Sequence, residues 1–274
     1  MTSQVPTPTL VTALYNINRA EKGDGRKWSE YLSWFAKTLQ LEIPMCIFVA
    51  KDMCEFVLQH RPEHLHAKTM IYCEALEDIP YAYLENELAA ITNSSEYKMK
   101  IRHPTRVECI LPFYNIIQYS KFPWLLKCAQ SNPFNSTHFF WVDAGISRFI
   151  DMDSPKRFLD EATINQHNKL IIQHNSILFD YIDKIDEGYL WDSQCLMCGT
   201  MFGGDIYAIK SMHELIQYEL TTRIKNSWIN NEQILLAYVY SKNSDMFHLI
   251  HNDSCHHLII FDILFPCSQN GCVI

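Results

Sequence analysis

The sequence is poor in glycine, with 8 in 274 residues, and it contains neither a GxGxxG nor a GxxxxGK(S/T) motif. The absence of these loops argues against a dinucleotide site or a P-loop. No run approaches about 18 uninterrupted apolar residues, so no membrane-spanning helix is expected. The opening residues, MTSQVPTPTL, have neither a charged start nor an apolar stretch, so no secretory signal is expected either.

Positive charge is also scarce. Lysine and arginine number 23 against 31 aspartates and glutamates, which gives a formal net charge of −8. A nucleic-acid-binding domain is usually strongly basic, so nucleic acid is not an expected partner. The hydrophobic fraction of 48% and the charged fraction of 20% are those of a globular protein long enough to form a sizeable core.

The ten cysteines come without a secretory signal, so we expect reduced thiols and a cytoplasmic location. Cys195 and Cys198 have CxxC spacing, but the sequence offers no second CxxC. Packing is therefore favoured over zinc binding or redox chemistry for this pair.

The first 75 residues alternate between strand and helix patterns. The expected elements are a strand over Leu10–Ile17, a helix over Trp28–Leu39, a strand over Ile43–Ala50, a helix over Asp52–Gln59 capped by Asp52, and a strand over Thr69–Cys73. Links this short predict parallel strands with right-handed crossovers. The result is half of a doubly wound sheet, the usual architecture for holding a nucleotide.

The stretch His138–Phe149, HFFWVDAGISRF, predicts a buried strand that ends in a turn. Asp143 would lie at the carboxyl edge of the sheet, where open α/β sheets bind ligands. A carboxylate there could hold a divalent cation under a substrate diphosphate. The alternative is an aspartate that caps its own turn, which is common.

The remaining patterns are less regular. A helix is expected over Tyr114–Ala129 and another over Ser211–Arg223, and the charged segment Asp151–Glu161 resembles a surface loop or lid. Thr163–Ser176 could be a helix or a pair of strands. The glycines within Cys195–Ile209 indicate backbone close to a ligand or, equally, a bulge or bend.

Two late features carry candidate functional groups. Glu232 opens a helix that runs over Ile234–Tyr240, where a carboxylate is first a capping device and becomes catalytic only if it faces the crevice. His248 and His251 are expected on a strand. One of them could complete a metal site with Asp143, although a core or surface role is the usual one for a histidine.

Several stretches together resemble the HtrL/YibB-type (WlaTC-like) glycosyltransferase family. They are TLVTALYNINR, the helix with Trp28, Tyr31, Leu32, Trp34 and Phe35, the strand P-x-C-I-F-V-A, Tyr119-Ser120-Lys121, Asn132-Pro133-Phe134 with FFWVDAGISRF, and NNEQILL. The similarity spans nearly the whole chain in order and is specific in WVDAGI and Arg19. It implies an α/β, GT-A-like (Rossmann-like) single domain over residues 1–274, with a mostly parallel central sheet flanked by helices. Residues 1–150 would form the nucleotide-sugar-binding half and residues 151–274 the acceptor-binding half.

The resemblance also implies site residues. Asp143 takes the place of the first aspartate of a metal-binding D-x-D motif, which here reads Asp143-Ala144-Gly145 and lacks the second carboxylate. Either another group such as His251 completes a Mn²⁺ or Mg²⁺ site, or the diphosphate mainly holds the cation. Arg19 would bind the phosphates, and Lys121 would bind phosphate or sugar hydroxyls. Gly203 and Gly204 would lie beneath the donor sugar. Glu232 would be the general base, or would orient the sugar if configuration is retained.

The implied reaction is metal-assisted and moves a sugar from a nucleotide-sugar to a hydroxyl on a glycan or glycosylated protein. A UDP-sugar is the favoured donor. Catalysis would depend above all on stabilising the charge of the departing nucleoside diphosphate. The alternative is a catalytically inert module on the same fold that binds a glycan or a nucleotide. The missing second aspartate supports that alternative.

Overall fold

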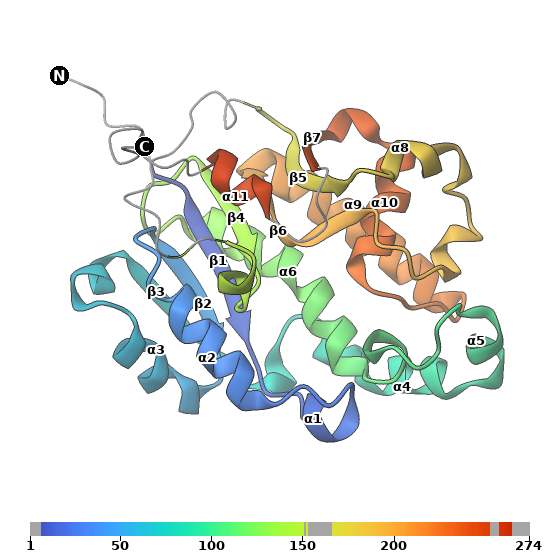
Figure 1. Ribbon diagram of the computed structural model, residues 1–274, viewed down its shortest axis with the longest axis horizontal. Helices are drawn as coiled ribbons and strands as arrows, with labels where there is room; N and C mark the ends of the chain where they lie inside the picture. The colour runs from blue at the N-terminus through green and yellow to red at the C-terminus, as the bar shows by residue number, and fades with distance from the viewer. Residues whose placement is uncertain (1–6, 151, 153–165, 253–257, 265–274) are drawn as a thin grey trace, which may run out of the picture.

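A seven-stranded sheet runs through the computed structural model, which describes residues 7–150, 152, 166–252 and 258–264 (Figure 1). The strand order is β3-β2-β1-β4-β6-β5-β7. The strands are β1 (Thr9–Leu14), β2 (Met45–Val49), β3 (Thr69–Cys73), β4 (His138–Val142), β5 (Leu170–Asn175), β6 (Met197–Asp205) and β7 (Phe247–Asn252). Every strand pairing is parallel except the two that β6 makes with β4 and β5. The predicted α/β class with a mostly parallel sheet is confirmed.

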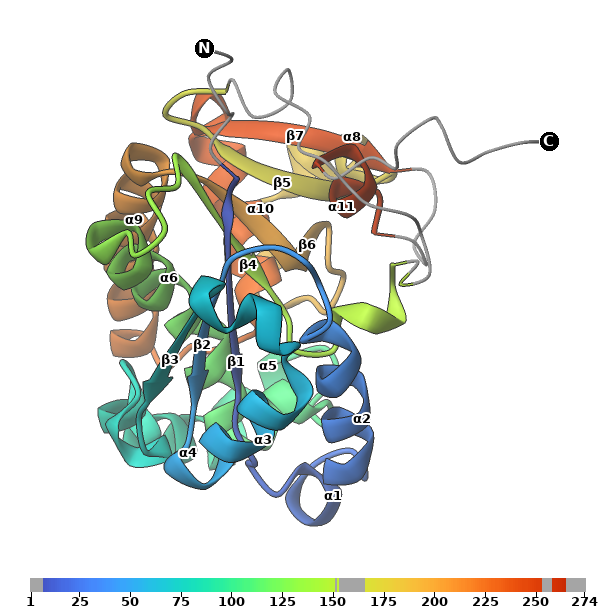
Figure 2. The same cartoon turned by 90° about the vertical axis from the view of Figure 1, so that its left-hand side faces the viewer.

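Helices cover both faces of this sheet (Figure 2). They are α1 (Arg19–Lys22), α2 (Trp28–Thr38), α3 (Cys54–His60), α4 (Glu85–Asn93), α5 (Ser95–Lys100), α6 (Pro112–Ser131), α8 (Leu178–Tyr181), α9 (Ile206–Lys225), α10 (Glu232–Lys242) and α11 (Ile259–Leu264). No helix among the described residues is both long and apolar enough to cross a membrane.

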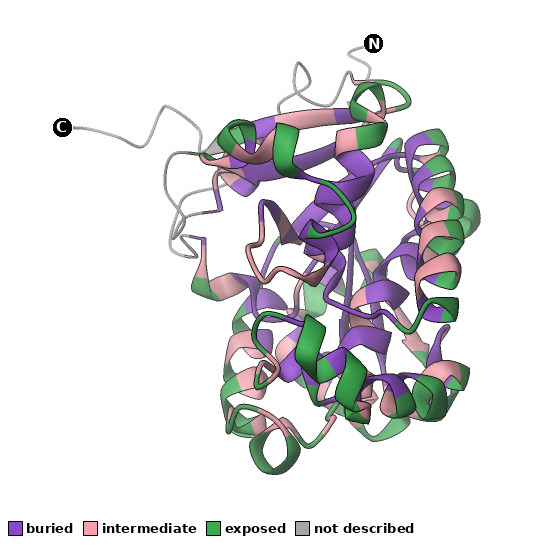
Figure 3. Ribbon diagram, turned by 90° about the vertical axis from the view of Figure 1, so that its right-hand side faces the viewer, coloured by how far each residue is buried: buried purple, intermediate pink, exposed green. Residues whose placement is uncertain are grey.

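The two faces of the sheet bury two separate cores. Val11 and Ala13 of β1 face the core beneath α6, α9 and α10, whereas Leu10 and Leu14 face the core beneath α2, α3 and α11. This alternation follows from the two-residue period of a strand. Because both faces are covered, β1, β2 and β4 are buried along their whole length. The interior of the molecule is accordingly purple in Figure 3.

The β-α-β-α-β pattern of the first 75 residues is confirmed, with one local error. Asp52 lies in a 3₁₀ turn, Lys51–Met53, and Met53 takes the cap position of α3 without a side-chain bond. The expected helix over Tyr114–Ala129 is α6, which starts at Pro112 and ends where Asn132 adopts a left-handed conformation with φ 38°.

The second half of the chain completes the same sheet. The undecided segment Thr163–Ser176 contains strand β5, and His248 and His251 lie on β7 as expected. The segment Asp151–Glu161, interpreted as a loop or lid, lies outside the described residues apart from Met152. Residues 1–150 and 151–274 are joined edge to edge, because β4 pairs with β6.

The expectation that all ten cysteines are reduced thiols is wrong for one pair. Cys54 at the start of α3 and Cys73 at the end of β3 form a disulfide, with their Cα atoms 6.9 Å apart. The connection from α3 to β3 brings the start of α3 next to the end of β3, and the spacing of the two cysteines in the sequence does not reveal this proximity. Cys195 and Cys198 are free thiols and are not bonded to each other.

Candidate functional site

A cavity of about 290 Å³ opens at the carboxyl ends of β1 and β4. The strand order reverses at this point, since the chain leaves β1 toward β2 on one side and returns as β4 on the other. Open α/β sheets bind ligands at such a switch point. The lining comes from residues 13–21, Arg26, Trp28, Tyr31, Tyr114, Ile117, Gln118, Lys121, Trp141, residues 143–145 and Arg148.

Five of the predicted site residues meet in this cavity, namely Arg19, Lys121, Asp143, Ala144 and Gly145. They come from α1, α6 and the turn after β4, so the fold gathers residues that lie more than a hundred positions apart. Glu232 lies directly behind this wall, in contact with Lys121. Gly203, Gly204 and His251 are not part of the lining.

Lys121 is a buried ammonium with all three of its donor positions occupied. Its Nζ donates to Glu232 Oε1 at 2.7 Å and to the Gly199 carbonyl at 2.9 Å, and it lies 3.0 Å from Asp143 Oδ1. Burial disfavours the charge, but Asp143 and Glu232 outweigh it and raise the pKa of Lys121. Lys121 therefore has no N–H left for a phosphate or a sugar hydroxyl, and its predicted role as a direct ligand is not supported by this geometry.

Asp143 holds one oxygen inward and leaves the other open. Its Oδ1 accepts from Trp141 Nε1 at 2.8 Å as well as contacting Lys121, and its backbone N–H donates to the Thr200 carbonyl. The side chain keeps 32% of its surface exposed. Within the described part of the chain, Oδ2 has no bonding partner. Asp143 therefore presents a single carboxylate oxygen to the cavity.

Glu232 is buried at the start of α10. Its Oε1 holds Lys121, and its Oε2 has no hydrogen-bond partner among the described residues. Burial raises the pKa of Glu232, although Lys121 acts in the opposite direction. The side chain is 1% exposed and does not line the cavity, so it acts on the site through Lys121 rather than on a ligand directly.

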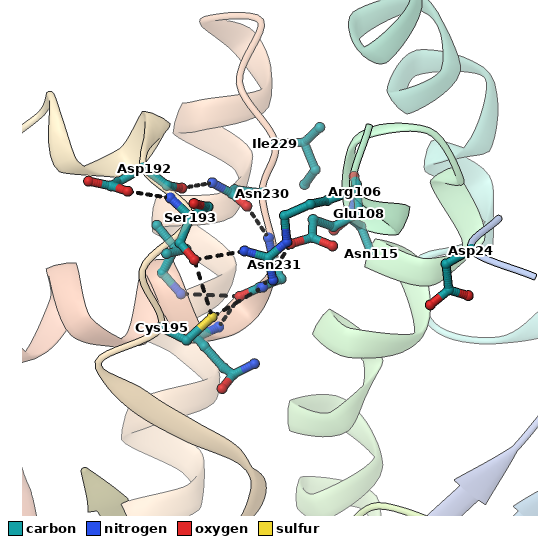
Figure 4. A network of polar contacts seen from close by, with 12 residues as sticks. Asp24, Arg106, Glu108, Asn115, Asp192, Ser193, Cys195, Ile229, Asn230 and Asn231 are labelled. Atoms are coloured by element: carbon teal, nitrogen blue, oxygen red, sulfur yellow. Dashed lines mark hydrogen bonds and ion pairs between the residues drawn. The ribbon is translucent and has the colours of Figure 1, made fainter. Parts of the chain in front are cut away.

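A polar network fixes the start of α10 and therefore Glu232 (Figure 4). Asn231 caps the helix through its Oδ1, while its Nδ2 donates to Glu108 Oε1 at 3.3 Å and to Cys195 Sγ at 3.6 Å. Glu108 in turn pairs with Arg106 at 2.8 Å. Sequence reasoning missed Glu108 and Arg106 because no local pattern marks them.

Arg19 reaches the cavity, but another side chain already binds it. Its Nε and Nη2 donate to both oxygens of Asp24 at 2.6 and 2.7 Å, and its Nη1 donates to Tyr31 Oη at 2.6 Å. Although burial alone would lower the pKa of Arg19, the Asp24 bond raises it. A phosphate would have to displace Asp24 to take the same bidentate position.

Two other guanidinium groups line the cavity without a carboxylate partner in the described chain. Arg26 lies over the rings of Tyr31 and Trp34 at 6.0 and 5.8 Å, and Arg148 lies over Trp34 at 4.3 Å. Burial lowers the pKa of Arg148 and the nearby charge of Arg26 lowers it further, whereas the charge of Asp143 acts in the opposite direction. Two neighbouring cations, neither of which forms an ion pair with a carboxylate of the described chain, suit a doubly charged anion. Neither was among the predicted site residues.

Aromatic rings form much of the remaining wall. Trp124 stacks between Tyr15 and Trp141, with ring centroids 5.9 Å apart on each side, and Tyr31 and Tyr114 line the cavity directly. Flat rings such as these can stack on a nucleobase or a sugar face.

The described residues gather no cluster of side-chain metal ligands around Asp143. Across them, no group of three or more histidine, cysteine, aspartate or glutamate side chains could hold a metal ion. His251 lies on β7, three strands from β4, or about 14 Å away at ordinary strand spacing. It contacts His174 instead, at 3.2 Å. The structure does not bring His251 to Asp143.

The glycines of β6 separate into two roles. Gly203 and Gly204 pair with Phe140 and Phe139, in the middle and first half of β4, and neither lines the cavity that Asp143 faces. A Cβ on Gly203 would come within 2.1 Å of the Phe139 carbonyl oxygen, which explains this glycine by strand packing. The glycine at the site is Gly199, where a Cβ would come within 2.1 Å of Glu232 Oε1.

Comparisons with known proteins match one family model and a set of solved structures that includes a distant xylosyltransferase. A family model described as "Bacterial protein of unknown function (HtrL_YibB)" matches residues 6–263. No sequence among the curated proteins matches. The crystal structure of mouse xyloside xylosyltransferase 1 in its apo form is similar over 89% of this chain and 84% of that chain, with 8% identity and a TM-score of 0.42.

Proposed function

The chain belongs to the HtrL_YibB family, whose description assigns no activity, and we propose that this member is a glycosyltransferase. It would move a sugar from a nucleotide-sugar to a hydroxyl group of a glycan or a glycosylated protein. The observation that carries the proposal is the cavity at the β1–β4 switch point, where Arg26 and Arg148 lack a carboxylate partner and aromatic rings form the wall.

The two ends of a nucleoside diphosphate match different parts of this cavity. Arg26 and Arg148 can offset the diphosphate charge, while Tyr31 and Tyr114 offer ring faces to the base. A volume of about 290 Å³ is near the lower limit of ligand pockets, so it suits the nucleoside diphosphate part of the donor. The sugar would then extend toward residues 151–274.

The transfer itself exchanges one bond for another at the anomeric carbon of the sugar. The acceptor oxygen forms a bond to that carbon, and the nucleoside diphosphate departs with the electron pair of the broken bond. The acceptor proton must go to a base. Glu232 is buried behind Lys121, whereas Asp143 lines the cavity and keeps 32% of its side chain exposed, so Asp143 is the carboxylate better placed to accept it in an inverting reaction.

The experiment is a panel of nucleotide-sugars, beginning with UDP-sugars, with released nucleoside diphosphate as the readout. Each donor is run with Mn²⁺ and with EDTA, using wild-type protein, Asp143→Ala and, as a matched control, the exposed Asp180→Ala. We expect release with one donor, a loss of activity in Asp143→Ala and normal activity in Asp180→Ala. Thermal shift with the same donors detects binding when an acceptor is needed for turnover. No stabilisation by any donor would refute the proposal.

A second candidate is a catalytically inert module that binds a nucleotide or a glycan on the same fold. The occupied side chains favour it, since Lys121 has no free N–H and Asp24 holds Arg19. Stabilisation by nucleotides without release from any donor, with candidate acceptors present, would support this module over the transferase.

A further inference from the structure

The oxygens around Lys121 form a cage of a kind that also binds metal cations. Two carboxylate oxygens, from Asp143 and Glu232, and one backbone carbonyl, from Gly199, surround Nζ at 2.7 to 3.0 Å. Carboxylate and carbonyl oxygens are the ligands that hard divalent cations prefer in proteins. A fourth oxygen, Glu232 Oε2, is buried beside them without a partner among the described residues.

Two neighbouring residues, Gly199 and Trp141, let these oxygens enclose the Lys121 ammonium. Gly199 lacks a side chain where a Cβ would meet Glu232 Oε1, so the strand backbone can approach both Lys121 and Glu232. The ring of Trp141 closes another side, with its centroid 5.5 Å from Nζ. The cage is therefore closed around Lys121, which is 1% exposed.

We propose that the Lys121 ammonium is a built-in cation that takes the place of a divalent metal beside Asp143. The inference rests on the proposed function only where it concerns the donor: Arg26 and Arg148 would then offset the diphosphate charge, and binding would need no metal. Lys121 acts as a positioning residue, because it touches Asp143 and Glu232 rather than a ligand.

The first test measures Mn²⁺ binding by electron paramagnetic resonance and needs no nucleotide. Wild-type protein should have no Mn²⁺ site at the cage. Lys121→Ala leaves the oxygens around an empty space, so it should gain a Mn²⁺ site there, at least about tenfold tighter than any Mn²⁺ binding elsewhere on the wild-type protein. Adding Asp143→Asn should abolish that gain. Lys121→Met fills the space with an apolar chain and should show no gain, which makes it the matched control.

Two results would overturn the inference. One is a Mn²⁺ site in wild-type protein that disappears in Asp143→Asn, because the ammonium and the metal would then coexist. The other is a Lys121→Ala protein that is folded by circular dichroism and binds no Mn²⁺, because the oxygens would then not form a cation cage.

A second measurement uses the wild-type protein and stays decisive if the Lys121 variants do not fold. UDP is titrated calorimetrically in EDTA and in Mn²⁺, and the two affinities should agree within about threefold, well below the effect of a lost metal contact. A gain of about tenfold or more with Mn²⁺ that is lost in Asp143→Asn would overturn the inference. If UDP binds in neither condition, the proposed function is in question while the Mn²⁺ titrations still decide the cage.

Discussion

Asp24 holds Arg19, a residue of the cavity wall, through both of its carboxylate oxygens at 2.6 and 2.7 Å. The side chains of Arg19 and Asp24 are 14% and 36% exposed, so the pair is accessible to a ligand. A phosphate and Asp24 would compete for the same face of the guanidinium. Asp24 therefore limits how strongly Arg19 can bind an anion in the cavity.

We expect Asp24→Asn to tighten UDP binding, because it releases Arg19 from a charged partner. A hydrogen bond to a charged group contributes about 1.5–3 kcal/mol, so the gain should be about tenfold or more. Calorimetric titration measures it, with Glu96→Gln as a control that removes a surface pair with Lys100. Weaker UDP binding in Asp24→Asn would show that Asp24 orients Arg19 instead of competing for it.

Arg148→Ala and Arg26→Ala should each weaken UDP binding by about tenfold or more, because each removes a charged donor that no carboxylate in the described chain holds. The wild-type affinity should also fall as salt is added. Arg102→Ala, which removes an exposed arginine paired with Asp192, is the control and should bind UDP normally. Unchanged affinity in both cavity variants would exclude the diphosphate site proposed here.

Glu232→Gln should make stability less sensitive to pH. The folded-state pKa of Glu232 is raised, so the folded protein keeps a proton that the unfolded chain releases as pH rises above about 4.3. The stability from this group is complete below that pH and is lost as pH rises through the folded pKa. Urea denaturation should show that the free energy of unfolding declines less between pH 4 and pH 8 in the variant than in the wild-type protein. An equal decline in both proteins would contradict this account of Glu232.

The glycines of β6 distinguish strand packing from ligand binding. Gly203→Ala should destabilise the fold by about 3 kcal/mol or more, because its Cβ would meet rigid backbone of β4. Gly199→Ala should instead displace Glu232 and disturb the contacts of Lys121. Thermal denaturation and donor binding are measured together. A Gly203→Ala protein of normal stability that no longer binds donor would restore this glycine to its predicted place beneath the sugar.

The disulfide should contribute measurable stability. It closes a loop between residues 19 positions apart, for which chain entropy alone gives roughly 3 kcal/mol. Cys54→Ser should therefore lower the urea midpoint, and a reductant should lower the wild-type midpoint to a similar level. A wild-type midpoint that does not respond to reductant would show that the bond is absent in solution.

The sequence predicted the features that depend on local pattern. The apolar run before Asp143 was sufficient to place that residue at the carboxyl edge of a strand. This prediction needs only the period of a strand and the direction of a parallel sheet. Arg19 was a candidate through the family resemblance, and it lines the same cavity.

The features that sequence reasoning missed depend on contacts between distant segments. Lys121 meets Glu232 across 111 positions and Gly199 across 78, and no local period reports such a pairing. His251 was grouped with Asp143 on chemistry alone, because the sequence does not show that two strands separate β4 from β7. Arg148 lies only five residues after Asp143, but its place beside Arg26 in the cavity wall appears only in the structure.

The antiparallel direction of β6 makes the two halves of the chain depend on each other at the site. Because this strand runs against β4, its first residues rather than its last reach the carboxyl edge, and they bring Gly199 to Lys121. A polypeptide ending at residue 150 would keep the arginines and Asp143, yet it would lose the Gly199 and Glu232 oxygens that hold Lys121 and would leave β4 without its neighbour β6. The two halves are therefore expected to exchange between relatives only as a matched set.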